Sequence, residues 1–174
     1  MKLTGSPLEG VWLVEQERVV DERGFFARTY DAELLPAVVQ MSTSFSASAG
    51  TLRGLHYQVE PHGESKLVRC TRGAIFDVVV DLRPDSPTRH DAFAIELSAE
   101  DGLALLVPEG FAHGFQTLAD DTEVLYAMDT PYVPQAARGV RWDDPAFAIA
   151  WPEPPAGGRT ISARDAGYAY IDQL

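Results

Sequence analysis

The segment Lys66–Leu82, KLVRCTRGAIFDVVVDL, contains two apolar runs that are separated by Thr71-Arg72-Gly73. Both runs are rich in Val, Ile and other residues that favour β-strands, and the short segment between them ends in glycine, which tolerates turn conformations. The pattern predicts two strands joined as a β-hairpin.

Short apolar segments separated by turn-forming residues occur along the whole chain. Twelve prolines and fourteen glycines interrupt short apolar runs at close intervals along the chain. This spacing is typical of antiparallel β-sandwiches and barrels rather than of alternating strands and helices. VWLVEQERVV (11–20) and FFARTY (25–30) flank the charged segment Asp21–Gly24, which predicts a strand, a turn and a second strand.

Three later segments also predict strands: AFAIEL (92–97), LALLV (103–107) and EVLYAM (123–128). In the first of them, alternation places Phe93, Ile95 and Leu97 on one face. The segment YDAELLPAVV (30–39) has room for one short helix before or up to Pro36. We therefore expect an all-β protein with few short helices.

The chain shows no internal repeat and no low-complexity tract. We expect a single domain over residues 1–174, because its length allows one continuous core. After Trp151 the sequence is rich in Pro and Gly and then polar. We expect this carboxy-terminal tail, about residues 152–174, to wrap the barrel.

The charge balance limits the choice of partner. The chain has 26 acidic and 14 basic residues, for a formal net charge of -12, which argues against nucleic acid or an anionic membrane as a partner. Any anionic ligand must then be small and meet a local basic cluster. Cys70 is the only cysteine, and no apolar run has signal-peptide or membrane-spanning character, so we expect a soluble, cytoplasmic protein.

A basic cluster of this kind lies in Gly50–Cys70, although the whole chain contains only two lysines. Its members are Arg53, His56, Lys66 and Arg69. In the predicted strand that begins at Lys66, alternation places Lys66 on the same face as Val68 and Cys70. A barrel built from such strands would aim both His56 and Lys66 into its interior.

Alternation in Leu52–Gln58 separates two of these residues. His56 shares a face with Gly54, whereas Arg53 points the other way or lies near the end of the strand. A single histidine is most often a hydrogen-bonded structural residue. Lys66 favours a functional interpretation, because a chain that otherwise uses arginine for its positive charge has kept a compact ammonium inside an apolar strand.

The segment Pro108–His113 has the spacing Pro-x-Gly-x-x-His, which resembles the second motif of cupins, small double-stranded β-helix barrels. Metal-binding cupins combine this histidine with a His-x-His pair and a glutamate. Here the strand of His56 supplies one histidine, and His62 and His90 lie in predicted loops. We therefore expect His113 to face a ligand in a site without a metal or other cofactor.

Five segments are similar to the dTDP-4-dehydrorhamnose 3,5-epimerase family, in family order and at family-like spacing. They are DERGFFARTY (21–30), GTLRGLHYQ (50–58), KLVRCTRGAIFDVVVDLRPDSPT (66–88), VPEGFAHGFQTL (107–118) and YVPQAARGVRWDDPAFAIAWP (132–152). The similarity extends from about Gly10 to Asp165. It implies a homodimeric, metal-independent cupin jelly roll that epimerises a nucleotide-diphosphate 4-keto-6-deoxysugar.

The resemblance also implies roles for individual residues. His56 would be the base, Tyr126 the opposing proton donor, Lys66 the stabiliser of the enolate, and Asp165 the partner of His56. Arg23, Arg53, His113 and Arg164 would hold the sugar and the diphosphate. The remaining predicted contacts are those of the nucleotide base, with Phe26 and Tyr132 against its faces and with Gln40, Ser42 and Arg28 at its edge.

Four positions depart from the family pattern: Arg28, Ser42, Pro131 and Ala137. They leave the thymidine specificity open but do not affect the predicted acid and base. Epimerases that act at a single carbon share the same motifs, so the number of inverted centres also stays open. The alternatives are a single-centre epimerase of another nucleotide 4-keto sugar, a metal-dependent cupin enzyme, and a catalytically silent sugar-nucleotide-binding protein.

The family site includes Arg23 and Phe26, which lie on the first predicted strand pair, far in sequence from His56. A jelly roll closes its barrel without this pair. We therefore expect the strands in VWLVEQERVV and FFARTY to cross to the barrel of a second copy and complete its site, in a homodimer with strand exchange.

Overall fold

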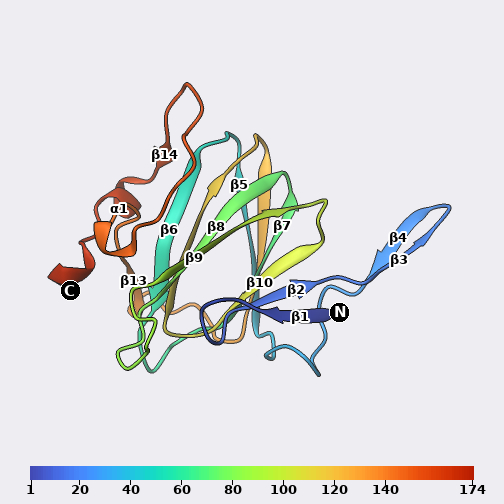
Figure 1. Cartoon of the computed structure of the whole chain (residues 1–174), viewed down its shortest axis with the longest axis horizontal. Helices are drawn as coiled ribbons and strands as arrows, with labels where there is room; N and C mark the ends of the chain where they lie inside the picture. The colour runs from blue at the N-terminus through green and yellow to red at the C-terminus, as the bar shows by residue number, and fades with distance from the viewer.

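The computed structural model describes residues 1–174 and is nearly all β (Figure 1). Its strands are β1 (Lys2–Gly5), β2 (Trp12–Glu15), β3 (Arg18–Asp21), β4 (Gly24–Ala27), β5 (Gln40–Ser46), β6 (Thr51–Gln58), β7 (Lys66–Arg72), β8 (Ala74–Asp81), β9 (Ala92–Ser98), β10 (Leu103–Val107), β11 (Phe111–Thr117), β12 (Thr122–Met128), β13 (Ala137–Gly139) and β14 (Thr160–Ile161). The helical segments are η1 (Pro145–Phe147), α1 (Ala163–Ala166) and η2 (Ile171–Gln173). No helix has the length and apolar character needed to cross a membrane.

Two sheets form the body of the molecule. One has the strand order β1-β2-β10-β7-β12-β5, and the other has the order β13-β6-β11-β8-β9, with β14 paired to β6. Neighbouring strands are antiparallel except for β14 and β6. This arrangement confirms the predicted all-β, cupin-like jelly roll.

The main core lies between the two sheets, because the inward faces of both carry apolar side chains. Val68 of β7 and Ile75 of β8 are fully buried there, together with Phe115 of β11. Leu97 of β9 is buried in the same cluster, and Phe93 and Ile95 pack against it, as the alternation predicts. The core therefore fixes which side chains of β7 and β11 face inward.

The predicted hairpin at Thr71-Arg72-Gly73 is wrong. β7 pairs with β10 and β12, whereas β8 pairs with β9 and β11 in the other sheet. Gly73, with φ +76°, lets the chain turn from one sheet to the other. Each strand lies between two neighbouring strands of its sheet. This buries its apolar residues more completely than a two-stranded ribbon would.

The predicted helix in residues 30–39 is also absent. The chain makes a single turn, in which the N–H groups of Leu34 and Leu35 donate to the carbonyl of Asp31. Pro36 follows directly and has no N–H with which to continue a helix. Tertiary packing of Leu35 against Val14 then holds the segment on the outside of the first sheet.

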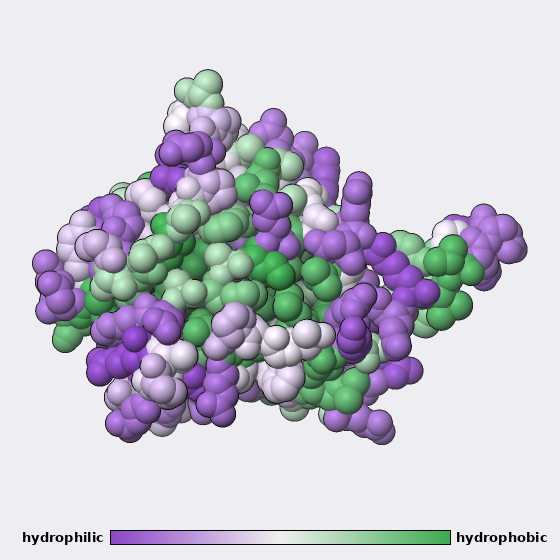
Figure 2. Space-filling model, viewed as in Figure 1, coloured by the Kyte–Doolittle hydropathy of each residue, from purple (hydrophilic) through white to green (hydrophobic).

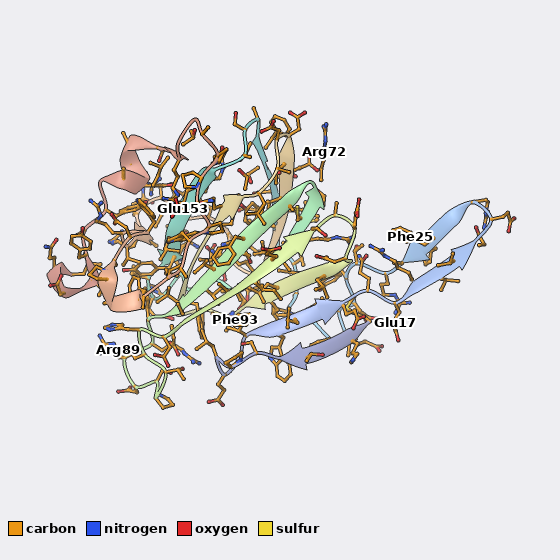
Figure 3. All side chains as sticks on the ribbon, turned by 45° about the horizontal axis from the view of Figure 1, so that its top comes forward. Glu17, Phe25, Arg72, Arg89, Phe93 and Glu153 are labelled. Atoms are coloured by element: carbon orange, nitrogen blue, oxygen red, sulfur yellow. The ribbon has the colours of Figure 1, made fainter.

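The strands expected to cross to a second copy behave in two different ways. β2 pairs with β1 and β10 of its own sheet, so the expectation that it crosses to a second copy is wrong for residues 12–15. β3 and β4 pair only with each other and project from the barrel (Figure 1). Apolar side chains are exposed on this hairpin (Figure 2), and Phe25 lies near its foot, outside the barrel (Figure 3).

The carboxy-terminal tail lies along the outer edge of the second sheet. β14 pairs with the first residues of β6, and α1 follows directly. Ser162 caps α1 by accepting a hydrogen bond from the N–H of Asp165. The cap and the strand pairing together bring Asp165 next to β6.

A bulge in the pairing of β6 with β11 changes the direction of one predicted site residue. His56 lies opposite His113 and Arg53 lies opposite Phe115, so the register shifts by one residue between them. Arg53 therefore lines the same cavity as His56. Of the two alternatives for Arg53, the opposite direction is wrong, and the position near the end of the strand is confirmed, since Arg53 is the third residue of β6. Gly54 makes this close approach possible: it has φ +132°, and a Cβ there would lie 2.5 Å from Cα of Gly114.

We predict that Gly54→Ala lowers the free energy of unfolding by about 2 kcal/mol or more, because the added methyl group meets backbone and the conformation is strained for alanine. Urea unfolding measures the change. Gly157→Ala is the control, since that position has open space around it. Equal stability of the two variants would contradict the role given to the bulge.

Candidate active site

The two sheets and the carboxy-terminal tail line an open cavity of about 590 Å³. It adjoins a second cavity of about 360 Å³, and the two share His56, Lys66, Tyr126 and Arg164 as lining residues. The first cavity also contains Arg53, His113 and Asp165, and the second contains Gln40, Ser42 and Tyr132. Residues predicted from distant parts of the sequence thus meet in one continuous space.

His56 and Asp165 form a hydrogen-bonded pair. The Oδ1 atom of Asp165 lies 2.9 Å from Nε2 of His56, and Oδ2 accepts a hydrogen bond from the N–H of Gly54 at 3.2 Å. Burial raises the pKa of the Asp165 carboxyl, but the bonds to His56 and Gly54 outweigh burial and leave this pKa below its ordinary value. An ionised carboxylate favours a proton on Nε2, which leaves the lone pair of Nδ1 available.

Lys66 is buried and paired with a carboxylate. Its Nζ atom lies 2.7 Å from Oε1 of Glu64. The side-chain amide of Gln58 donates to the other oxygen of Glu64 at 3.2 Å. The side chain of Asp129 accepts a hydrogen bond from the N–H of Ser65, which fixes the backbone between Glu64 and Lys66. The ammonium is therefore held in a defined position in the wall that the two cavities share.

His113 is buried opposite His56, and its Nε2 atom lies 2.7 Å from Oδ1 of the fully buried Asp77. Tyr126 faces this pair from the other sheet, with its ring edge-on to His113. The Tyr126 hydroxyl lies 3.2 Å from Oγ of Ser44. Burial raises the pKa of Tyr126 well above its ordinary value, which the hydrogen bond with Ser44 only partly opposes. The phenol stays protonated and can donate.

The outer cavity gathers several residues predicted to contact a nucleotide base. The N–H of Tyr132 donates to Oε1 of Gln40 at 3.0 Å, which links the loop after β12 to edge strand β5. Ser42 lines the same cavity from β5, and Arg164 lies between the two cavities. Tyr132 keeps about half of its surface exposed. Its ring is thus accessible to a planar ligand.

Three predicted site residues lie elsewhere. Arg23 is in the turn of the projecting hairpin and pairs with Asp21, and Phe26 on β4 is 77% exposed. Arg28 pairs with Asp31 at the foot of the hairpin. One chain therefore does not bring these residues to its own cavity.

Three contacts within the site involve residues that the sequence analysis did not select: Ser44, Glu64 and Asp77. Asp77 could have been selected from the sequence, because it lies within the apolar run AIFDVVVDL and a charge inside a buried strand needs a partner. Alternation in QMSTSFS places Ser44 on the face of Ser42. Glu64 lies in a loop, where no periodicity points to it.

No group of three or more His, Cys, Asp or Glu side chains is arranged so that it could hold a metal ion. The two cavity histidines are instead each bonded to one carboxylate.

The fold and the site together define a cupin-type protein whose cavity holds a histidine–aspartate pair, a lysine and a protonated tyrosine. This set of groups suits proton transfer on a bound carbonyl compound. The chain belongs to the dTDP-4-dehydrorhamnose 3,5-epimerase family, whose sequence model matches residues 5–173. It is therefore an isomerase.

Individual relatives agree with this assignment. The dTDP-4-dehydrorhamnose 3,5-epimerase of Sinorhizobium fredii is 46% identical over 149 residues, which are 82% of this chain and 76% of the relative. The crystal structure of the enzyme of the same name from Bacillus anthracis, with TDP and PPi bound, has a TM-score of 0.92 and 39% identity, and the match covers 98% of this chain and 99% of that one.

A third relative has a different outcome of catalysis. ChmJ, a 3'-monoepimerase from Streptomyces bikiniensis solved in complex with dTDP-quinovose, has a TM-score of 0.86 and 31% identity, and the match covers 96% of this chain and 86% of that one. The same architecture therefore occurs in an enzyme that is named for inversion at one carbon.

We predict that Tyr126 does not ionise through the range of about pH 8 to 11 in which an exposed phenol titrates. Wild type and Tyr126→Phe should then show the same increase in near-ultraviolet phenolate absorbance over this range. An increase in wild type that is larger by one phenolate would contradict the raised pKa.

Proposed function

We propose that the protein inverts carbons 3 and 5 of dTDP-4-dehydro-6-deoxy-D-glucose to give dTDP-4-dehydro-L-rhamnose. The observation that carries this proposal is the placement of the His56–Asp165 pair and Tyr126 on opposite sides of one cavity, with Lys66 lining it from β7, the strand beside that of Tyr126. Epimerisation needs a base on one side of the sugar and an acid on the other.

His56 is the proposed base. The 4-keto group of the substrate acidifies the hydrogens on carbons 3 and 5. The Nδ1 atom of His56 takes the proton from carbon, and its Nε2–H stays bonded to Asp165, whose negative charge stabilises the imidazolium that forms. The electron pair of the broken C–H bond moves onto the 4-keto oxygen, giving an enolate.

Lys66 and Tyr126 complete the reaction. The Lys66 ammonium stabilises the enolate oxygen, which is the atom that gains negative charge. Tyr126 then gives its hydroxyl proton to the carbon from the opposite side, which inverts the centre. After each of the two inversions, proton exchange with solvent returns the Tyr126 phenolate to phenol and the His56 imidazolium to imidazole. These proton transfers need no metal or redox cofactor.

The remaining residues bind the nucleotide sugar. Arg53 and Arg164 line the cavity without a carboxylate partner, so their charges suit the diphosphate, and His113 contacts the sugar or diphosphate from β11. Tyr132 stacks on the nucleotide base, with Gln40 and Ser42 at its edge.

A second candidate is a single-centre epimerase of a nucleotide 4-keto sugar, which the similarity to a 3'-monoepimerase favours. In deuterium oxide such an enzyme would exchange only one of the two carbons. Comparing dTDP, GDP and CDP sugars in the same assay identifies the nucleotide.

We predict that His56→Ala lowers the rate of solvent exchange at both carbons by ~10²–10⁴-fold, because removal of a general base has this effect and blocks every later step. Deuterium incorporation followed by NMR measures it. Elemental analysis of the wild type is the companion experiment. Near wild-type exchange in the variant, or a stoichiometric transition metal bound through His56 and His113, would refute the assignment.

The active form is, in our proposal, a homodimer in which the β3–β4 hairpin of one chain completes the site of the other. The hairpin pairs with no other strand of its own chain, and Val19, Val20, Phe25 and Phe26 expose 54–77% of their surfaces on it. A second barrel would bury this apolar surface. Phe26 would then stack on the base, Arg23 would reach the diphosphate, and Arg28 would lie near the base edge.

We predict that an equal mixture of inactive His56→Ala and inactive Arg23→Ala chains regains about a quarter of the wild-type sites. Random pairing makes half of the dimers mixed, and each mixed dimer has one site with both native residues. Light scattering checks the dimer. A monomer at working concentration, or mixed chains that stay inactive after proven exchange, would show that the hairpin does not cross.

A further inference from the structure

Tyr168, which follows α1 in the carboxy-terminal tail, packs edge-on against the ring of His56. The two ring centroids are 5.9 Å apart, with an interplanar angle of 76°. This is the T-shaped geometry that aromatic pairs favour. Tyr168 therefore touches the base of the proposed reaction, although it is not among the residues that line the cavity.

Gly139 explains how the tyrosine reaches this position. In the pairing of β13 with β6, Gly139 lies directly opposite His56. A side chain there would be the cross-strand neighbour of the histidine. Glycine has none, and a Cβ at this position would overlap ring atoms of Tyr168. The tyrosine ring thus occupies the place of the missing cross-strand side chain.

His56 needs such a neighbour on the β13 side, because its ring is only partly enclosed. The side chain keeps 42% of its surface exposed, and its one hydrogen bond, to Asp165, is made through Nε2. A single bond at the end of the ring leaves the plane of the imidazole free to tilt. Contact with a second ring restrains the tilt, and so sets the direction of the Nδ1 lone pair.

We propose that Tyr168 is a positioning residue for His56: its ring fills the space above Gly139 and, together with Asp165, fixes the orientation of the imidazole. The effect on rate rests on the proposed function, whereas the contact itself does not. The ring rather than the hydroxyl carries the role, because the ring makes the contact. Burial raises the pKa of Tyr168, so the ring stays neutral beside the histidine.

The first test compares three variants in the exchange assay. Tyr168→Ala should lower kcat about 3- to 10-fold, the range expected for loss of one aromatic pair. KM should change less than kcat, because Tyr168 touches the cavity wall through Arg164, whose guanidinium carbon lies 5.8 Å from the ring centroid, but does not line the cavity itself. Tyr168→Phe should restore the wild-type rate. Tyr170→Ala is the matched control, since Tyr170 lies in the same tail but packs against Arg141.

The Tyr168→Ala change could lower the rate simply by loosening the carboxy-terminal tail. A double-mutant cycle with Gly139→Ala distinguishes that effect from loss of the ring contact. Gly139→Ala inserts a methyl group into the space that the tyrosine ring fills, so it should lower kcat by itself. In the Tyr168→Ala background that space is free, and the same change should cost little more. Additive losses, or an unaffected Gly139→Ala variant, would overturn the proposal.

NMR of the histidine rings provides a test that does not depend on catalysis. The chain has four histidines, and His56→Ala assigns the signal of interest. Tyr168→Ala should shift and broaden the ring signals of His56 and leave those of His62 unchanged, whereas Tyr168→Phe should keep them. Unchanged His56 signals in Tyr168→Ala would overturn the contact even in a protein that is fully active.

Discussion

The hydrogen bond between His56 and Asp165 is the contact on which the rest of the site depends. It joins β6, a central strand of the barrel, to a tail that is more than a hundred residues further along the chain. The same carboxylate also accepts the N–H of Gly54, at the bulge that turns Arg53 into the cavity. The Asp165 carboxylate therefore orients the base, anchors the tail and bonds to the backbone at the bulge of β6.

Charge pairing divides the positive groups of the cavity into two sets. His56, His113 and Lys66 each have a carboxylate within hydrogen-bond distance, provided by Asp165, Asp77 and Glu64. Arg53 and Arg164 have no ion pair. The paired groups are held in fixed geometry, as proton transfer and enolate stabilisation require, and the unpaired guanidinium groups are free to meet an anion. An acidic chain can bind an anionic ligand in this way because two guanidinium groups without a carboxylate partner line the cavity.

Much of this could be predicted from the sequence, because the strand periodicity and the motif spacing are local. Alternation correctly placed Lys66 with Val68 and Leu97 with Phe93, and the family motifs placed His56 beside Asp165. Strand partners are set by non-local packing, which is why β7 and β8 resembled a hairpin but belong to different sheets.

The remaining differences have similarly specific causes. A one-residue bulge reversed the expected direction of Arg53, and alternation cannot show a bulge. Glu64 lies in a loop without periodicity, so its contact with Lys66 was visible only in three dimensions. Asp165 and Tyr168 lie on a polar tail whose sequence alone predicts exposure, and they reach β6 because β14 pairs with it.

The central claim is that one cavity inverts two carbons of a nucleotide-linked 4-keto sugar by proton transfer. Its most direct test is to incubate the wild-type protein with dTDP-4-dehydro-6-deoxy-D-glucose in deuterium oxide and to follow both the isotope content and the configuration by NMR. We expect deuterium at carbons 3 and 5 of a product with both centres inverted. Deuterium at only one of the two carbons, or at neither, would contradict it.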